Sequence, residues 1–262
     1  MNRTCVRLVI GSAAVVILGT GCAKQQWQQS QRLEILKEAD KVTLTHVVAP
    51  GETLRTIAAL YYDDPAKADA IALENGRLDP EAVRVGEEIL LSFDDDEWAR
   101  ADLRRQALVP FNRGVAALRE ARLQDAGDAF HGALNLDPDF FDAQYNLALV
   151  WLKRGRSEDA EAMLLPLLDR HPGDPDVVLA WGQSLFYQAR FTEAVHAFDQ
   201  ILADDPNHRE AAFSRAKALS AAGDRPVAES AWRAFLQRHP EGSWADRARQ
   251  ELRNLDESEG EP

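Results

Sequence analysis

The stretch that decides the fold is AGDAFHGALNLDPDF, residues 126–140, which returns in related form as AVHAFDQILADDPNH at residues 194–208. The two stretches lie two periods apart, and a proline marks each period, at Pro138, Pro172, Pro206 and Pro240. Three more columns recur at the same interval: Ala126, Ala160, Ala194, Ala228; Gly114, Ala148, Gly182, Ala216; and Phe130, Leu164, Phe198, Trp232. Agreement in four columns identifies an internal repeat.

A period of about 34 residues with two small residues, one bulky residue and a proline resembles the tetratricopeptide repeat (TPR) family. The resemblance implies that each repeat is an antiparallel pair of helices. Small residues let the two helices approach closely, and the bulky residue fills the wedge between neighbouring pairs. Proline suits the end of a repeat because it cannot continue the preceding helix. We therefore expect four repeats over residues 107–242, a capping helix over 243–255 and a disordered acidic tail at 256–262.

The TPR resemblance also implies a concave face, lined by the first helix of each pair, that binds a protein partner. The expected lining residues are Phe111, Asn112, Tyr145, Asn146, Leu149, Gln183, Phe186, Phe213 and Lys217. Asparagine in the column of Asn112 and Asn146 grips the ligand backbone in peptide-binding members of the family, but Ala180 and Ser214 replace it in the later repeats. The aromatic residues are expected to be exposed on this face, and packing between repeats is the alternative.

A different pattern covers residues 45–92. Residues 46–48 have the pattern of a short strand, residues 54–62 and 65–74 that of two helices, and residues 88–92 that of a closing strand. Gly51 and the pair Asn75-Gly76 interrupt this pattern at two loops. The sequence therefore predicts a small βααβ domain ahead of the repeats.

The motif Pro50-Gly51-Glu52-Thr53-Leu54, with Asn75-Gly76, Asp79-Pro80 and Gly86 following in order, resembles the LysM family. The resemblance implies a groove between two loops that binds N-acetylglucosamine units of peptidoglycan or chitin. It assigns glycan binding to Gly51, Glu52, Thr53, Leu54, Asn75, Arg77, Leu78, Asp79 and Pro80. The alternative is that these residues only build the fold. Because the segment holds nine acidic and four basic residues, backbone groups and small apolar surfaces, rather than charge, are expected to bind the glycan.

Residues 1–21 have the features of an export signal. Arg3 and Arg7 precede an apolar run that is shorter than the roughly 20 residues a helix needs to cross a bilayer. Residues 18–22, LGTGC, resemble the lipobox of bacterial lipoproteins, which implies a lipid on Cys22; an ordinary signal in which Cys22 is incidental is the alternative. By the same resemblance, Ala23 favours sorting to the outer membrane, facing the periplasm. Residues 22–44, rich in Gln, Lys and Glu, are expected to form the lipidated tether.

Residues 93–106 are expected to join the two domains, with Asp94, Asp95 and Asp96 starting a helix from Glu97 onward. The net charge of −13 argues against nucleic acid as a partner. The six histidines show no metal-ligand spacing, and the sequence contains no nucleophile or phosphate-binding motif. We therefore expect no catalytic residues, no metal and no cofactor.

Together these patterns predict a mainly α-helical protein, a βααβ LysM domain followed by a TPR solenoid. The expected function is that of a non-enzymatic envelope lipoprotein that binds peptidoglycan and recruits an unidentified envelope protein. The alternatives are an assembly lipoprotein of a pilus, secretion or outer-membrane machine, and a regulator of a wall hydrolase.

Overall fold

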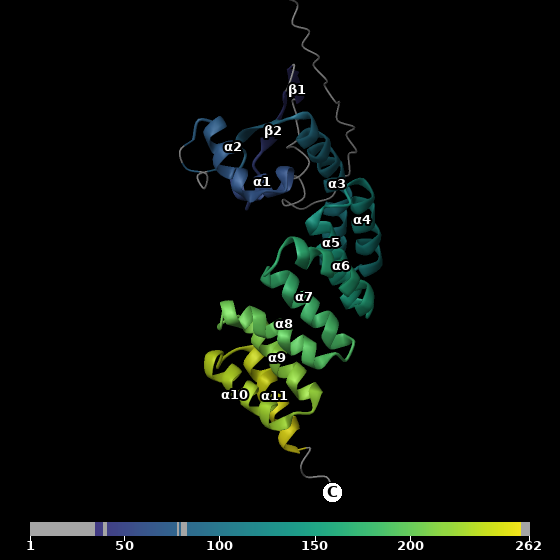
Figure 1. Ribbon diagram of the computed structural model, residues 1–262, viewed down its shortest axis with the longest axis vertical. Coiled ribbons are helices and arrows are strands. Elements are labelled where there is room, and N and C mark those ends of the chain that lie inside the picture. The colour runs from purple at the N-terminus through teal and green to yellow at the C-terminus, as the bar shows by residue number, and fades with distance from the viewer. Residues whose placement is uncertain (1–34, 39–40, 78, 80–82, 258–262) are drawn as a thin grey trace, which may run out of the picture. The chain divides into compact units, whose positions relative to one another are not determined.

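The computed structural model describes residues 35–38, 41–77, 79 and 83–257. The expected signal peptide, Cys22, most of the tether, Leu78, Pro80 and the tail from residue 258 lie outside the described residues. The chain divides into two compact units, residues 1–108 (unit 1) and 109–262 (unit 2), and each is described by itself. The described residues are mainly α-helical, with a small sheet in unit 1 (Figure 1).

The sheet of unit 1 has three antiparallel strands in the order β1 (Ile35–Glu38), β2 (Lys41–Val47) and β3 (Glu88–Phe93). Val42, Leu44, His46 and Val48 are buried, and the residues between them are more exposed. This two-residue period is that of a strand with one face on the core. Leu44 lies opposite Leu91 of β3, so β2 and β3 share one apolar face.

The position of β2 corrects the expected domain boundary. The tether was expected to reach residue 44 and the strand to cover only residues 46–48, but β2 begins at Lys41 and Leu44 has no exposed surface. The alternation of Val42 and Leu44 extends the pattern of His46 upstream and is the signal that the sequence analysis missed. Strand β1 pairs with β2 through the backbone, which does not require apolar side chains.

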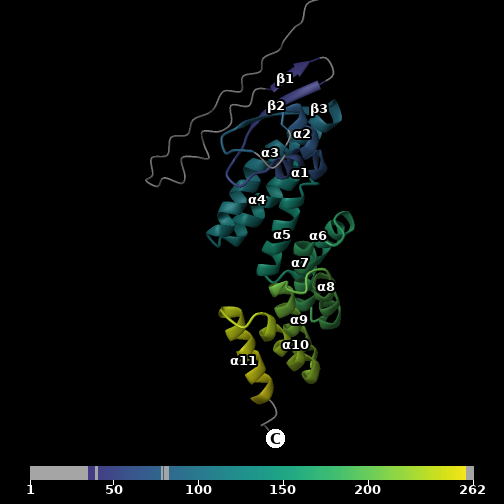
Figure 2. The same cartoon turned by 90° about the vertical axis from the view of Figure 1, so that its left-hand side faces the viewer.

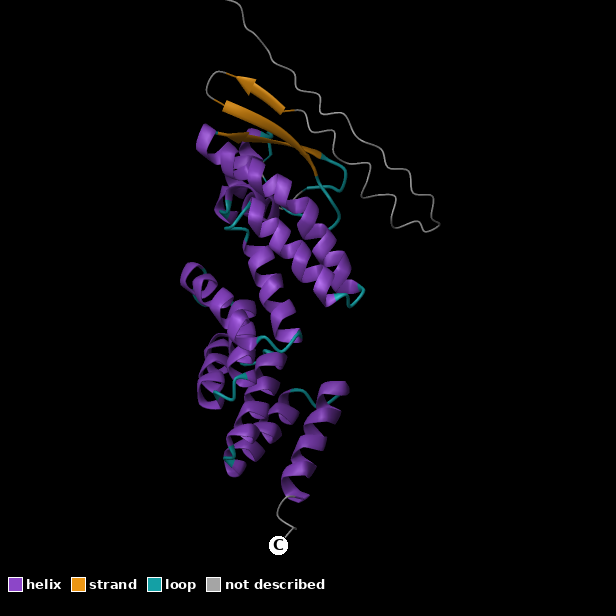
Figure 3. Ribbon diagram, turned by 90° about the vertical axis from the view of Figure 1, so that its right-hand side faces the viewer, coloured by secondary structure: helices purple, strands orange, loops and turns teal. Residues whose placement is uncertain are grey.

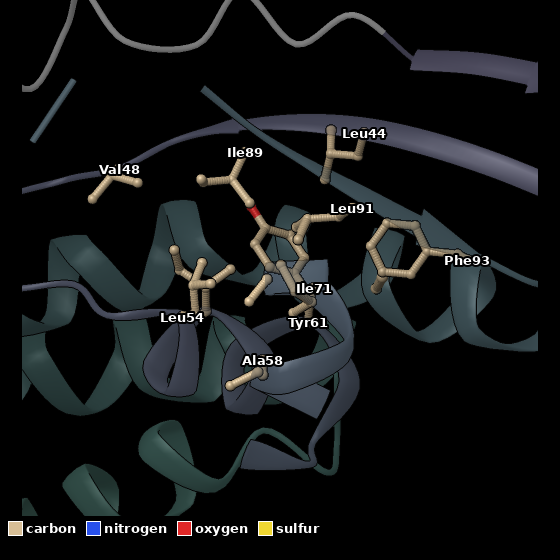
Figure 4. Close-up of a cluster of buried hydrophobic side chains, with 13 residues drawn as sticks. Leu44, Val48, Leu54, Ala58, Tyr61, Ile71, Ile89, Leu91 and Phe93 are labelled. Carbon is tan, nitrogen blue, oxygen red and sulfur yellow. The ribbon is translucent and has the colours of Figure 1, made fainter. Parts of the chain in front are cut away.

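Two helices pack on one face of this sheet: α1 (Leu54–Tyr62) and α2 (Ala68–Glu74), joined by the 3₁₀ turn η1 (Pro65–Lys67) (Figure 3). Thr53 fixes the start of α1, because its hydroxyl accepts the N–H of Thr56 at 3.2 Å and the Thr56 hydroxyl accepts the N–H of Thr53 at 2.8 Å. The expected order of strand, helix, helix and strand is observed, preceded by β1. The core between helices and sheet contains Leu44, Leu54, Ala58, Tyr61, Ile71, Ile89, Leu91 and Phe93 (Figure 4).

Helix α3 (Asp95–Arg119) is one continuous helix. Asp94 caps it: its carboxylate accepts the N–H of Glu97 at 2.7 Å, and the Glu97 carboxylate accepts the N–H of Asp94 at 3.2 Å. A joining segment over residues 93–106 was expected to be separate from a first repeat starting at residue 107. No break separates them within α3, and the boundary between the two units falls inside this helix.

Unit 2 continues as a series of antiparallel helix pairs. The helices are α4 (Leu123–Leu136), α5 (Phe141–Lys153), α6 (Ser157–Arg170), α7 (Pro175–Tyr187), α8 (Phe191–Asp204), α9 (Arg209–Ala222), α10 (Arg225–Arg238) and α11 (Ser243–Glu257). From α4 on, each helix packs against the next one along the chain, as the colour sequence from teal to yellow shows in Figure 1. Such nearest-neighbour packing is characteristic of a repeat array.

The repeated columns of small and bulky residues meet inside each helix pair. A Cβ atom added to Gly114 would lie 2.6 Å from Cε1 of Phe130, and one added to Gly182 would lie 2.6 Å from Cε1 of Phe198. Because such distances are too short for carbon atoms, glycine is required wherever phenylalanine fills the facing position. The repeat period seen in the sequence therefore follows from the packing of these columns.

Helix α11 occupies the position expected for the capping helix, and it also includes Asp256 and Glu257 of the expected tail. It packs against α9 and α10 (Figure 2). Ala248 of α11 joins the cluster of Phe213, Trp232 and Phe235, so α11 covers an apolar surface that the last repeat would otherwise expose.

Candidate functional site

A groove of about 490 Å³ lies in unit 2 and is bounded mainly by α5, α7, α9 and α11. These four helices are the first members of successive pairs, as expected for the concave face. The groove is lined by Tyr145, Leu149, Leu152, Lys153, Asp176, Leu179, Ala180, Gln183, Phe186, Tyr187, Phe198, Glu210, Phe213, Ser214, Lys217, Trp244 and Arg247. Apolar and polar side chains line it together, as in surfaces that bind another molecule.

Two of the positive charges in this groove lie on aromatic rings. Nζ of Lys217 lies 4.7 Å from the ring centre of Phe186, and Cζ of Arg247 lies 4.8 Å from that of Phe213 and 5.2 Å from that of Trp244. Arg209, at the start of α9, approaches the same Trp244 ring at 5.9 Å. A cation over the face of a ring is attracted by the electrons of the ring, and the contact leaves the cation exposed to other ligands.

Negative charges gather near Tyr145, toward the first turns of α7 and α9. The pKa of Tyr145 is raised to about 12 by burial and then by the carboxylates of Asp176, Asp174 and Glu210. Glu210 also accepts a hydrogen bond from Nε2 of Gln183 at 3.1 Å. Asp174 is occupied as the cap of α7, since its carboxylate accepts the N–H groups of Asp176 and Val177. The groove thus holds carboxylates near Tyr145 as well as the cations Lys217 and Arg247.

Six of the nine residues expected on the concave face line this groove: Tyr145, Leu149, Gln183, Phe186, Phe213 and Lys217. The other three do not. Phe111 packs inward on Phe130 and Phe140, with ring centres 5.6 and 4.8 Å away. Asn112 is exposed outside the groove, and the amide of Asn146 donates to the carbonyl of Asp142 in its own helix at 2.7 Å. The groove does not begin at α3, which corrects the expected extent of the surface.

Phe213 lines the groove but is a core residue. Its exposed fraction is 3%, and its ring packs edge-on against Trp232, Phe235 and Trp244 at centroid distances of 4.9, 5.5 and 4.8 Å. The expectation that Phe213 is an exposed contact residue was therefore wrong. The alternative, that an aromatic residue in this column packs between repeats, describes it correctly.

Two groove residues on the last helix, Trp244 and Arg247, were not predicted. Both follow groove positions by one repeat period, Trp244 after Glu210 and Arg247 after Phe213. The interpretation of α11 as a cap alone hid this signal. Extending the repeat columns by one more period would have found both residues.

In unit 1, a buried hydrogen-bonded group holds the loop that precedes α1. Nε2 of His46 lies 2.8 Å from Oε2 of Glu52, Nδ1 of His46 lies 3.1 Å from the hydroxyl of Tyr61, and the same Glu52 oxygen accepts the N–H of Ala49 at 2.7 Å. Burial raises the pKa of Glu52, but the bonds from His46 and Ala49 outweigh it, so the pKa is lowered. Burial and the charge of Glu52 raise the pKa of Tyr61. His46 was not singled out, although the period-2 pattern of β2 places it inward.

Several residues expected to bind a glycan are engaged in the fold. Thr53 caps α1 and Leu54 is fully buried. The Asn75 amide donates to the carbonyls of Ile71 and Leu90 and accepts the N–H of Leu90, each at 2.8 Å. Glu52 bonds to His46 as described above. These four side chains help to build the fold, which is the alternative to glycan binding given above.

The remaining expected glycan contacts lie around the two loops. Gly51 is exposed in a left-handed conformation with φ of 88°. Arg77 forms an ion pair with Glu87, and the Glu87 carbonyl accepts the N–H of Val48 at 2.8 Å, so this turn links the two loop regions. Asp79 is exposed.

Within the described ranges, no cluster of three or more His, Cys, Asp or Glu side chains could hold a metal ion. None of the helices in the part of the chain that the structure describes is long and apolar enough to cross a membrane.

Comparison with known families matches two models described as tetratricopeptide repeat, at residues 117–180 and 179–224. The chain carries tetratricopeptide repeats. The TPR match covers α4 to α9 and agrees with the repeat columns, the helix pairs and the packing of small against bulky residues. The resemblance seen in the sequence of unit 2 is therefore confirmed.

Known relatives share only part of this chain. The rat protein DnaJ homolog subfamily C member 3 is 32% identical over 97 residues, which cover 37% of this chain and 19% of the relative. The Drosophila melanogaster protein O-mannosyl-transferase Tmtc3 is 30% identical over 103 residues, 39% of this chain and 11% of the relative. This chain therefore spans a fifth or less of the length of either relative.

Solved TPR structures share the fold. The protein YrrB, described as a TPR protein with an unusual peptide-binding site, superposes with a TM-score of 0.51 at 20% identity, over 59% of this chain and 79% of that one. MamA from Desulfovibrio magneticus RS-1 superposes with a TM-score of 0.50 at 19% identity, over 56% and 83%. At these identities the likeness shows the fold of the repeats alone.

Proposed function

We propose that this protein is a non-catalytic envelope adaptor whose TPR groove binds an extended segment of another envelope protein. TPR arrays are scaffolds for protein–protein interaction, and the proposal assigns that role to the groove between α5 and α11. The N-terminal unit binds peptidoglycan glycan, and a lipid on Cys22 anchors the chain to the outer membrane, facing the periplasm.

One observation carries the proposal for unit 2: the groove contains apolar side chains that the fold does not fully cover. Tyr145, Leu149 and Phe186 are half-buried, and Tyr187 is 60% exposed at the edge. Apolar side chains of this size in a concave surface gain free energy when a partner covers them, about 25 cal/mol for each Å² removed from water. An extended peptide segment has the width and the side-chain spacing to cover several of these residues at once.

A double variant, Tyr145→Ala with Phe186→Ala, tests the groove in the full-length protein. We expect it to fold and to lose capture of partner proteins from solubilised native envelopes, identified by crosslinking and mass spectrometry. The matched control is Leu165→Ala on α6, a 45% exposed apolar residue outside the groove. Equal capture by the double variant and the control contradicts the proposal.

Glycan binding by unit 1 is supported by the LysM-like motif, the observed order β2, α1, α2, β3 and the two glycine-bearing loops linked through Glu87. Because Glu52, Thr53, Leu54 and Asn75 are engaged in the fold, the proposal gives the contacts to backbone groups of residues 49–54 and 75–79. Backbone N–H and C=O groups in open loops can bind the acetamido group of the sugar.

Chemical shifts of the ¹⁵N-labelled protein during titration with N-acetylglucosamine oligomers test this site. We expect changes confined to the amides of residues 49–54 and 75–79 and binding that higher salt does not weaken, because unit 1 carries an excess of acidic residues. No changes, changes confined to unit 2, or steep loss with salt contradicts it.

The anchor is supported by the export pattern and the lipobox-like residues 18–22. We expect Cys22→Ser to release the protein into soluble fractions and to abolish labelling by a fatty-acid probe. A variant that stays in the membrane, unprocessed, contradicts lipid anchoring. The adaptor could serve wall maintenance, a pilus, secretion or outer-membrane machine, or a wall hydrolase, and the captured partner distinguishes among these roles.

A further inference from the structure

We propose that the end of the groove formed by α9 and α11 recognises acidic side chains of the bound segment, so that the partner carries carboxylates beside its apolar residues. This inference rests on the proposed function of the groove and adds the chemistry of its occupant. It follows from how the cations of the groove are held.

Several arginines outside the groove form ion pairs with carboxylates of the same chain. Arg190 lies 2.7 Å from Glu161 and Glu193, Arg225 lies 2.9 Å from Glu229, and Arg233 lies 3.1 Å from the same Glu229. The chain has 43 acidic and 30 basic residues, so carboxylates outnumber cations.

Among the described residues, the cations that line the groove, Lys153, Lys217 and Arg247, make no ion pair, although Asp176 and Glu210 belong to the same groove. Two of them lie over rings: Lys217 over Phe186, and Arg247 over Phe213 and Trp244. The rings hold the cations in place without neutralising them.

Placement over a ring prepares these cations for an anionic ligand. A guanidinium that is already oriented loses less conformational freedom when it binds a carboxylate with two parallel hydrogen bonds. The adjacent floor, with Leu179 and Phe186, is apolar and offers nothing to a purely polar anion. The combination fits a protein segment that presents glutamate or aspartate next to large apolar residues, and it does not fit a nucleic-acid backbone.

Carboxylates are also present in the groove. Asp176 and Glu210 raise the pKa of Tyr145, and Glu210 is held by Gln183. Carboxylates of the partner are repelled by these residues and attracted by Lys217 and Arg247. The acidic residues of the segment are therefore expected to bind at Lys217 and Arg247.

Three fluorescein-labelled synthetic peptides test the inference on the full-length protein by fluorescence anisotropy. One has a leucine–phenylalanine core followed by two glutamates, the second has glutamines in place of the glutamates, and the third is a glutamate oligomer without apolar residues. We expect the glutamate peptide to bind at least about tenfold more tightly than the glutamine peptide at about 50 mM salt, and this preference to shrink at about 300 mM. The glutamate oligomer should bind more weakly than the first peptide.

Variants assign the preference to the groove. Lys217→Gln with Arg247→Gln should lower affinity for the glutamate peptide to that for the glutamine peptide, which should be unchanged. Because the Lys217 side chain is exposed, Lys217→Gln alone should reduce the preference for the glutamate peptide without changing thermal unfolding. This single variant shows that the loss of preference does not come from unfolding. The control Arg233→Gln removes a charge that is paired with Glu229, on α10, and should change neither affinity.

Equal binding of the glutamate and glutamine peptides, with both lost in Tyr145→Ala, overturns this inference and leaves the proposed function standing. Binding of the glutamate oligomer as tightly as the first peptide also overturns it, because it shows attraction by charge alone. If none of the peptides binds, both the inference and the peptide-binding groove fail.

Discussion

The two units use their polar side chains in opposite ways. In unit 1, Glu52 and Asn75 were expected to contact a ligand, but their hydrogen bonds hold a loop and tie α2 to β3. In unit 2, Lys217 and Arg247 lie in the groove without a carboxylate partner among the described residues. A small βααβ core needs its loop side chains for stability. A repeat array is stabilised by its buried columns instead, and its concave face remains available to a ligand.

The largest effect should come from Phe213→Ala, at a groove position that also belongs to the core. Removing a buried aromatic ring surrounded by Trp232 and Phe235 should lower the free energy of unfolding by about 3–5 kcal/mol. The measurement is urea denaturation of the full-length protein followed by circular dichroism. Phe186→Ala, at a half-buried ring on the groove floor, is the control and should cost clearly less. Equal losses of unfolding free energy would mean that the groove residue Phe186 contributes to stability as much as the core residue Phe213 does.

Asn75→Ala should have the next largest effect. The substitution leaves the backbone N–H and C=O groups of Leu90 and the carbonyl of Ile71 without this partner, at a cost of about 1–3 kcal/mol. Hydrogen exchange by mass spectrometry should show faster exchange in α2 and β3 and no change in unit 2.

The control for this experiment is Asn146→Ala. The Asn146 amide donates to a carbonyl within its own helix, so its removal should change the free energy of unfolding only slightly. If Asn75→Ala abolishes glycan binding and leaves exchange in unit 1 unchanged, the asparagine is a ligand group and the contrast between the units fails.

Glu52 should make the stability of unit 1 depend on pH. Because its pKa in the folded protein is lowered from 4.5, its contribution is present above pH 4.5 and is lost as the pH falls through the lowered value. Glu52→Gln should cost about 1–2 kcal/mol near neutral pH, where the charge-assisted bond to His46 is lost, and less at low pH. Urea titrations followed by amide signals of unit 1 measure this. Exposed Glu88 offers the matched control, Glu88→Gln, with little effect expected at either pH.

The smallest effect on stability should come from Lys217→Gln. Its side chain is exposed and makes no ion pair in the described structure, so the free energy of unfolding should change by no more than about 0.5 kcal/mol. Thermal denaturation checks this. A larger loss would show that the contact with Phe186 holds the array together and that the groove cations, like the loop residues of unit 1, serve the fold.

Much of this organisation could be predicted because the relevant signals are local or periodic. The run Asp94, Asp95 and Asp96 predicted the start of a helix, and the four columns located the helix pairs. The capping role of Thr53 was not predicted. Strand β1 could not be predicted, because its pairing with β2 uses the backbone. Six of nine groove residues were identified from the columns, whereas Trp244 and Arg247 were missed because α11 was taken only as a cap.

By itself, the sequence determined the repeats. A small residue is required opposite Phe130 and Phe198, and a small residue faces a bulky one once in every repeat. Only the tertiary structure decided which side chains remain available. Phe213 and Tyr145 share one column of the repeat, yet Phe213 is covered by Trp232, Phe235 and Trp244, while Tyr145 is half-buried at the groove. Burial and ion pairing depend on neighbours from other helices, and a periodic pattern does not record the distances between them.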